Sequence, residues 1–197
     1  STSFRAWRMS KQRLFMTNAS NKIATHEITI RPTQLADANQ LPKIEQSAGE
    51  LFSSIKELSW ISESGVQSVE AHIQFIHQHA HWVAVNHDNH PVGFIMTQQL
   101  PESVFIHELS VSKDWQNKGI GKLLIQTVKN EAKLQQFNAI TLTTFRDVPW
   151  NAPYYQRLGF HILLEHQIPY SLQQILDNEV EHGGFAREMR CAMKCEI

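Results

Sequence analysis

The pattern of hydrophobic and polar positions predicts a chain in which strands and helices alternate. Strand-like alternation or short apolar runs occur at residues 28–30, 82–86, 92–99, 104–111, 140–144, 160–164 and 188–194. A helical period occurs at 35–52, 69–77, 120–134, 153–158 and 172–180. Turn residues at 87–91 predict a hairpin, and Gly159 predicts the end of the helix before it. The order predicts a mixed α/β fold.

All of these elements lie within residues 27–197, and a length of 197 residues is typical of one domain. We therefore expect a single domain over 27–197. Residues 1–26 differ, because they contain basic residues such as Arg5 and Arg8 and no acidic residue. This composition predicts a basic, mobile tail, with an organelle-targeting peptide as the alternative.

Composition narrows the function classes. The formal net charge is -1 and the pI is about 6.8, which gives no reason to expect binding to nucleic acid or to a membrane surface. Cys191 and Cys195 lie four residues apart, too far for a bridge along one extended strand. Free thiols are typical of a reducing compartment, so we expect a cytoplasmic protein.

The segment Gln-Asn-Lys-Gly-Ile-Gly at 116–121 lies between a predicted strand and a predicted helix. Glycines allow a tight turn and close approach to a ligand, and the amides at a helix start attract phosphate. Two common phosphate loops are excluded. A Walker loop needs Ser or Thr where Leu123 stands, and a dinucleotide loop needs Gly where Leu124 stands.

The remaining pattern resembles the GNAT superfamily of N-acetyltransferases. Its acetyl-coenzyme A loop reads Q/R-x-x-G-x-G/A after a strand ending in L-x-V, as Leu109-Ser110-Val111 does here. A second landmark, N-A-P-Y-Y-Q-R-L-G-F, runs from residue 151 to residue 160. The resemblance covers residues 27–197. It implies a mixed, mostly antiparallel sheet that splays after the fourth strand, with helices on both faces.

The resemblance also implies a binding site for acetyl-CoA as cosubstrate. The strand end would pair with the pantetheine arm, an amide near Leu109 would face the thioester oxygen, and the loop would hold the pyrophosphate. Asn151 would bind the pantetheine arm or cap its own helix. The implied donor-binding residues are Leu109, Ser110, Val111, Gln116, Asn117, Lys118, Gly119, Ile120, Gly121, Lys122 and Asn151.

Acetyl transfer also needs an acid for the leaving thiolate and a base for the acceptor ammonium. Tyr155 lies at the position of the tyrosine that acts as general acid in the family. The alternative interpretation is a buried aromatic side chain that only packs below the loop. His107 and Glu108 precede Leu109. His107 resembles the proton acceptor of amine acetyltransferases, and Glu108 is either an alternative base or a recognition site for ammonium. Their adjacent positions predict opposite faces of the strand, unless the splay disturbs the alternation.

The acceptor walls are expected at 45–60 and 146–150. The segment T-T-F-R-D-V-P-W-N at 143–151 resembles a subgroup of small bacterial-type acetyltransferases. The candidate acceptor-binding residues are Phe52, Arg146, Asp147 and Trp150, although Asp147 could instead pair with Arg146. Some relatives carry a catalytic Glu on the fifth strand, and this chain has Thr143-Thr144-Phe145 there.

The resemblance implies transfer of acetyl to the primary amine of a small molecule by a monomer or homodimer. Peptide or protein N-acetylation and a non-catalytic CoA-binding role are the alternatives. No metal is expected, because the alternating His77, His79 and His81 have no nearby acid or cysteine to complete a ligand set.

Overall fold

The structure is a computed structural model that describes residues 27–60 and 65–197. The tail expected at 1–26 lies outside the described residues. The described chain forms a seven-stranded sheet in the order β1-β2-β3-β4-β5-β7-β6. The strands are β1 (Thr29–Pro32), β2 (His81–Val85), β3 (Pro91–Gln99), β4 (Val104–Val111), β5 (Ala139–Phe145), β6 (His161–Ile162) and β7 (Arg190–Glu196).

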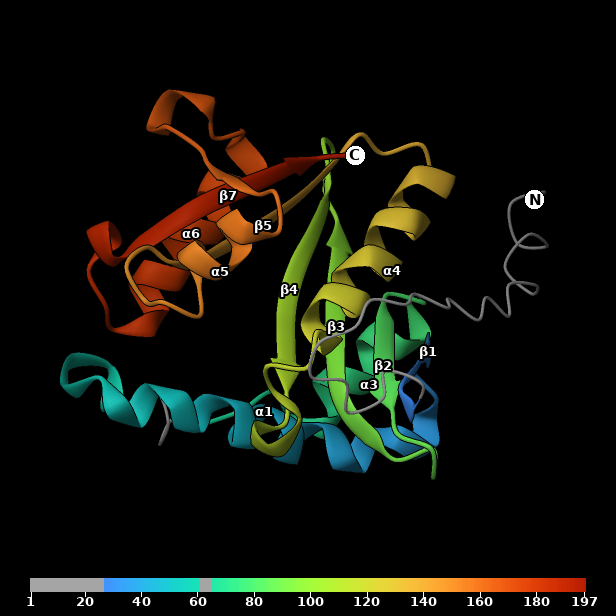
Figure 1. Ribbon diagram of the computed structural model, residues 1–197. Coiled ribbons are helices and arrows are strands. Elements are labelled where there is room, and N and C mark those ends of the chain that lie inside the picture. The colour runs from blue at the N-terminus through green and yellow to red at the C-terminus, as the bar shows by residue number, and fades with distance from the viewer. Residues whose placement is uncertain (1–26, 61–64) are drawn as a thin grey trace.

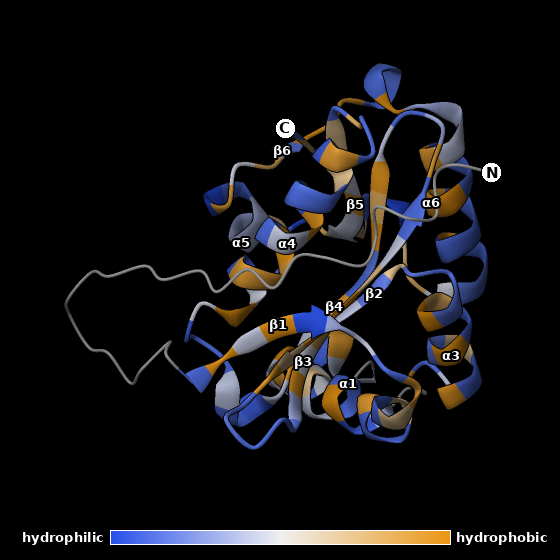
Figure 2. Cartoon of the chain, turned by 90° about the vertical axis from the view of Figure 1, so that its right-hand side faces the viewer, coloured by the Kyte–Doolittle hydropathy of each residue, from blue (hydrophilic) through white to orange (hydrophobic). Residues whose placement is uncertain are grey.

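Helices cover both faces of this sheet (Figure 1). The helices are α1 (Leu41–Gly49), α3 (Val69–His77), α4 (Ile120–Leu134), α5 (Ala152–Arg157) and α6 (Tyr170–Gly183). Buried residues of α4 and α5 share one core cluster, whereas α1 packs with α3 and α6 packs separately against other residues of the sheet. The outer side of α6 is largely hydrophilic (Figure 2). Every neighbouring pair of strands is antiparallel except β4 with β5. The predicted fold class is confirmed.

Two predicted elements differ from the structure. The helix expected at 35–52 is divided into a 3₁₀ turn (Leu35–Gln40), α1 and a second 3₁₀ turn (Glu50–Ser54). Pro42 lies in the first turn of α1, where its missing N–H costs nothing, so the α-helix starts there. The strand expected at 160–164 is shorter, because the amide of Phe160 bonds the Tyr155 carbonyl and closes α5.

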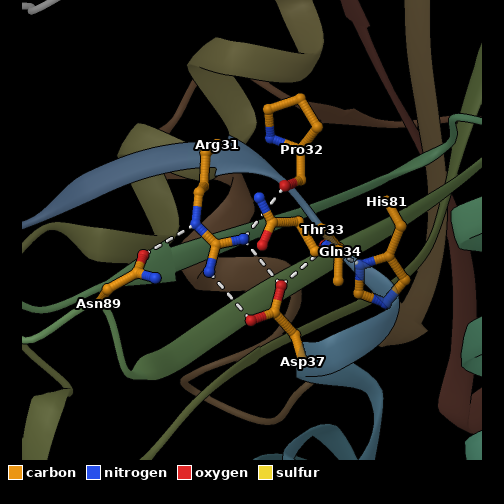
Figure 3. A network of polar contacts seen from close by, with 7 residues as sticks. All are labelled: Arg31, Pro32, Thr33, Gln34, Asp37, His81 and Asn89. Carbon is orange, nitrogen blue, oxygen red and sulfur yellow. Dashed lines mark hydrogen bonds and ion pairs between the residues drawn. The ribbon is translucent and has the colours of Figure 1, made fainter.

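A polar network ties β1 to the hairpin between β2 and β3 (Figure 3). The Arg31 guanidinium donates to both carboxylate oxygens of Asp37, at 2.7 and 2.9 Å, and to the side-chain oxygen of Asn89 at 3.0 Å. Asp37 is buried, so this bidentate pairing satisfies a charge that would otherwise destabilise the fold. The network fixes the sheet edge far from the strands that carry the candidate site.

A buried histidine pair joins α3 to β2. Nδ1 of His72 lies 2.9 Å from Nε2 of His81, whose Nδ1 lies 2.6 Å from the Thr33 hydroxyl. His72 and His81 are 0% and 2% exposed. Burial lowers the pKa of His72 to about 4 and, with the His72 charge, that of His81 to about 3. Both imidazoles are therefore neutral in the folded protein at neutral pH.

This pair predicts acid-sensitive stability. The unfolded histidines have a pKa of about 6.5, so below that pH the unfolded state binds more protons than the folded state. We expect the free energy of unfolding to fall as the pH drops from about 6.5 toward 3, by up to about 2.7 kcal/mol per pH unit for two protons. Urea unfolding between pH 7 and pH 4.5 measures this slope.

The matched variants are His72→Asn, which keeps a polar group beside His81, and His87→Asn at an exposed position. His72→Asn should flatten the slope by about half, and His87→Asn should leave it unchanged. Equal slopes in all three proteins would show that the pair does not control the acid response.

Candidate active site

The sheet splays between its two central strands. The described pairs between β4 and β5 are Val104 with Ile140 and Phe105 with Thr141. Beyond them the two strands diverge (Figure 1), while β4 continues to pair with β3 as far as Val111. The side of β4 that faces β5 therefore carries backbone groups without a strand partner among the described residues. Such an edge can pair with an extended ligand.

A β-bulge lies within this part of β4. Met96 pairs with Glu108 and Thr97 with Ile106, so His107 is the extra residue. The His107 ring lies 5.1 Å from the Phe75 ring of α3, and Met96, opposite Glu108, packs in the core cluster that α1 and α3 share. His107 and Glu108 thus both lie on the α1 and α3 side of the sheet. The prediction of opposite faces was wrong, because the bulge interrupts the alternation.

Glu108 is the strongly perturbed acid of the site. Burial raises the pKa of Glu108 to about 8, and the nearby Glu45 carboxylate adds to this, while the Ser110 hydroxyl, Arg190 and the Leu109 amide oppose it. The Ser110 hydroxyl donates to the carboxylate at 3.1 Å. A carboxyl group with this pKa can exchange a proton near neutral pH.

His107 is more exposed to solvent than Glu108. Partial burial of the ring beside Phe75 and Phe105 lowers the pKa of His107, and the Glu179 carboxylate on α6 opposes the change. At neutral pH the imidazole is therefore mostly neutral and able to accept a proton.

The predicted glycine loop leads from β4 into α4. The Gln116 side chain donates to the Val111 carbonyl at 2.9 Å, which holds the loop against the strand end. Asn117 and Gly119 adopt positive φ angles of 60° and 80°. Gly119 is the N-cap of α4 and, within the described chain, no side chain caps this end. The free amides of the first turn of α4 are therefore available to an anion.

The two glycines of the loop have different roles. A Cβ added at Gly119 would meet no atom within 4 Å among the described residues, so this position borders open space. A Cβ at Gly121 would lie 2.5 Å from the Tyr154 hydroxyl and 3.8 Å from a methyl of Leu109. Gly121 therefore allows α4 to pack closely against α5, and Gly119 lies on the side from which a ligand would approach.

Basic side chains extend from this loop along α4. A cavity of about 220 Å³ is lined by Lys122, Ile125, Gln126, Lys129, Arg157, Leu158 and Gly159. Its three cations suit a phosphate group. Lys129 and Arg157 were missed at the sequence level, although the seven-residue spacing from Lys122 to Lys129 places both lysines on one helix face. The ammonium of Lys118 lies over the Trp115 ring at 5.1 Å.

Tyr155 lies on α5 with its ring packed against Tyr154 and Phe160, at centroid distances of 5.3 and 5.7 Å. It is 9% exposed. Burial raises the pKa of Tyr155 well above its usual range, and the charges of Glu108 and Tyr154 add to the shift. The phenol thus stays protonated, which is the form a general acid requires.

Asn151 precedes α5. Its carbonyl accepts the amide of Tyr155 at 3.0 Å, but its side chain makes no capping bond within the described part of the chain. The side-chain amide donates instead to the Trp150 carbonyl at 3.3 Å, and the side-chain oxygen is buried without a partner among the described residues. The alternative that this side chain caps α5 is therefore wrong.

Two of the four predicted acceptor residues, Phe52 and Trp150, contact each other beside the diverging end of β5. The ring of Phe52 lies 5.7 Å from Phe145 and 5.6 Å from Trp150. Phe185 adds a fourth ring, 5.3 Å from Phe145. We call these four residues the aromatic cluster. Trp150 has its indole nitrogen buried without a described partner.

Arg146 and Asp147 do not form the ion pair considered as an alternative, as far as the described residues go. Arg146 donates to the carbonyls of Glu188 and Arg190, both at 3.4 Å, and Asp147 is exposed.

Sequence reasoning missed Arg190, at the start of β7. Its guanidinium lies 4.6 Å from the centre of the Phe145 ring and 5.3 Å from that of Phe185. It pairs with Glu179 at 3.1 Å, and Glu179 also accepts the Thr143 hydroxyl at 2.6 Å. A carboxylate thus reaches the fifth strand from α6, although the strand itself has none. No motif marks Glu179 or Arg190 in the sequence.

The histidines at 77, 79 and 81 are separated by the fold. His81 is buried against His72, whereas His77 ends α3. The described residues contain no group of three or more His, Cys, Asp or Glu side chains placed to hold a metal ion. They also contain no helix of the length and hydrophobicity needed to cross a membrane.

Comparison with known proteins agrees with this arrangement. The family model described as "Acetyltransferase (GNAT) family" matches residues 48–160, more than half of the chain. This match includes β4, the glycine loop, α4, β5 and α5.

Solved structures share the fold. The PaiA N-acetyltransferase from Thermoplasma acidophilum, in complex with coenzyme A, is similar with a TM-score of 0.63 at 17% identity, covering 86% of this chain and 99% of that one. N-acetylglutamate synthase from Neisseria gonorrhoeae, with coenzyme A and N-acetyl-glutamate, gives 0.64 at 15% identity, covering 86% and 35%. The ribosomal-protein-S18-alanine N-acetyltransferase from Escherichia coli gives 0.58 at 18%, covering 86% and 94%. With the splayed sheet and the glycine loop, the family match shows that this chain belongs to the GNAT family of acetyltransferases.

Proposed function

We propose that the protein transfers the acetyl group of acetyl-CoA to a primary amine of a small molecule. The observation that carries the proposal is the position of Tyr155. It follows the splayed β4 edge and the glycine loop in the chain, it is buried, and it interacts electrostatically with Glu108. An acid and a proton acceptor thus share one site beside an unpaired strand edge.

The donor fits the features of the site. The unpaired edge of β4 would pair with the amides of the pantetheine arm, and the free amides of α4 would bind the pyrophosphate. Lys122, Lys129 and Arg157 would then bind the remaining phosphate of CoA.

The chemistry requires three proton movements. We assign Glu108 to take a proton from the acceptor ammonium, so that the neutral amine attacks the thioester carbonyl. The C–N bond forms, the C–S bond breaks, Tyr155 protonates the leaving sulfur, and the resulting phenolate takes the second proton that the amide nitrogen loses. The Leu109 amide stabilises the Glu108 carboxylate in the structure. Once Glu108 is neutral, this amide is free to stabilise the oxyanion.

The pH dependence of kcat/KM distinguishes the two candidate bases. If Glu108 is the base, activity requires its ionised form, and the acidic limb should have an apparent pKa near the value of about 8. Glu108→Gln should remove that limb and lower kcat for every acceptor, roughly 10²-fold or more. A limb below 6.5 that disappears in His107→Ala would assign the proton to His107 instead, since its pKa is lowered.

A CoA-thiol release assay with small amines and with peptides tests the reaction itself. Turnover with small amines and none with peptides is the expected result. Peptide acetylation is the alternative that one structural neighbour performs by name. CoA binding without turnover of any amine would favour the alternative of a non-catalytic CoA-binding protein. The retained Tyr155 and Glu108 argue against that role, because a binding module needs neither group.

A further inference from the structure

We propose that the acceptor is a small amine with one positive charge on a hydrophobic, preferably aromatic, body. The ammonium would approach Glu108 and Glu45, and the body would lie against the aromatic cluster. This inference rests on the proposed function and names its substrate class.

Two carboxylates of the site, those of Glu45 and Glu108, lie close enough to repel each other. Glu45 on α1 accepts the amide of Gln67 at 2.9 Å, and Glu108 accepts the Ser110 hydroxyl. Neither carboxylate has an ion pair within the described chain, where six other pairs are found. Burial raises the pKa of both groups, and the Glu45 charge raises that of Glu108 further. A bound ammonium would relieve this repulsion.

Aromatic side chains line the space between the diverging strands. The 3₁₀ turn after α1 runs past the diverging ends of β4 and β5 (Figure 1). It carries Phe52, whose ring contacts Phe145 of β5 and Trp150 of the following loop. This contact joins the two sides of the splay with aromatic surface, which suits an apolar body better than an extended polypeptide. A peptide acceptor would need an open groove at this point.

Basic residues beside the aromatic cluster disfavour a second cation on the acceptor. The Arg190 guanidinium packs against Phe145 and Phe185, at the base of the aromatic cluster. Arg146 and Arg187 both donate to the Arg190 carbonyl, at 3.4 and 3.0 Å. A polyamine that places one ammonium at Glu108 would bring its distal ammonium toward these guanidinium groups. Arg190 is paired with Glu179 and Arg187 with Glu165. The repulsion therefore comes mainly from Arg146, which has no ion pair among the described residues. A hydrophobic body avoids this repulsion and gains burial instead.

The test compares kcat/KM at saturating acetyl-CoA for four acceptors: 2-phenylethylamine, ethylamine, spermidine and a free amino-terminal tetrapeptide. We expect 2-phenylethylamine to exceed ethylamine by about 50-fold, the gain for burying a phenyl ring. Phe52→Ala should reduce this ratio several-fold, and Leu164→Ala, at an exposed position, should not change it. Glu45→Gln should raise KM for both monoamines more than it lowers kcat.

Circular dichroism and calorimetric titration with CoA show whether each variant is folded and binds the donor. A preference for spermidine or the tetrapeptide, or a ratio that Phe52→Ala does not alter, would overturn the inference while the acetyltransferase proposal stands. If the wild-type protein binds no CoA, or releases no thiol with any amine, both proposals fail.

Discussion

Replacing Tyr155 with phenylalanine is expected to lower kcat by roughly 10²–10⁴-fold, the range for loss of a positioned acid. The leaving thiolate has a free pKa of roughly 8.5, and without a proton donor it departs less readily. The phenol of Tyr155 is well suited to this role, because burial keeps it protonated. Its ring would remain in the core with phenylalanine, so the fold and the affinity for CoA should change little. Steady-state kinetics with saturating acetyl-CoA measures the effect.

The neighbouring Tyr154 provides the matched control. It lies on the same helix, and its ring packs against that of Tyr155. Tyr154→Phe also removes one phenol oxygen and should retain most of the turnover. Equal losses in both variants would point to disturbed packing of α5. Unchanged turnover in Tyr155→Phe would mean that Tyr155 only packs in the hydrophobic core and donates no proton.

Donor binding should fail in Gly119→Asp. This residue caps α4 at a φ of 80°, and a side chain there would meet no described atom within 4 Å, so it would project into open space. Aspartate tolerates this conformation better than most residues. Its carboxylate would repel the pyrophosphate, and a repulsion of about 3 kcal/mol at intermediate dielectric corresponds to roughly 10²-fold weaker binding. Calorimetric titration with CoA gives the dissociation constant.

Gly184→Asp is a closely matched control for this variant. Gly184 has a φ of 74°, and a Cβ there would likewise meet no described atom within 4 Å. It lies at the end of α6, away from the loop. The control should have the same unfavourable backbone conformation for a non-glycine residue and should bind CoA with unchanged affinity. If the two variants bind CoA equally well, the pyrophosphate does not lie at the 116–122 loop.

The fold was largely predictable, because periodicity and turn residues report local geometry. The bounds of α4 and of β4 were predicted to the residue. The glycine loop was predictable for the same reason, since a positive φ at Gly119 and the start of a helix are local events. Pro42 could have indicated the break in the helix expected at 35–52.

The electrostatics of the site could not be predicted in this way. The bulge at His107 depends on pairing with β3. The pKa of Glu108 depends on its burial in the fold and on Glu45, 63 positions earlier in the chain. The contact of Arg190 with Phe145 and Glu179 likewise joins distant segments. The buried pair of His72 and His81 was hidden, because the sequence pattern grouped His81 with two histidines that lie elsewhere.

The splay also has a mechanical consequence. Two described residue pairs join β4 to β5 at the centre of the sheet, so hydrogen bonds there connect the half built on β1–β4 only weakly to the half built on β5–β7. A ligand that pairs with the β4 edge and also contacts α5 would become part of that connection. The two halves of the sheet would then move least relative to each other when acetyl-CoA is bound, and most after CoA has left. The bound donor would thus contribute to the rigidity of the protein.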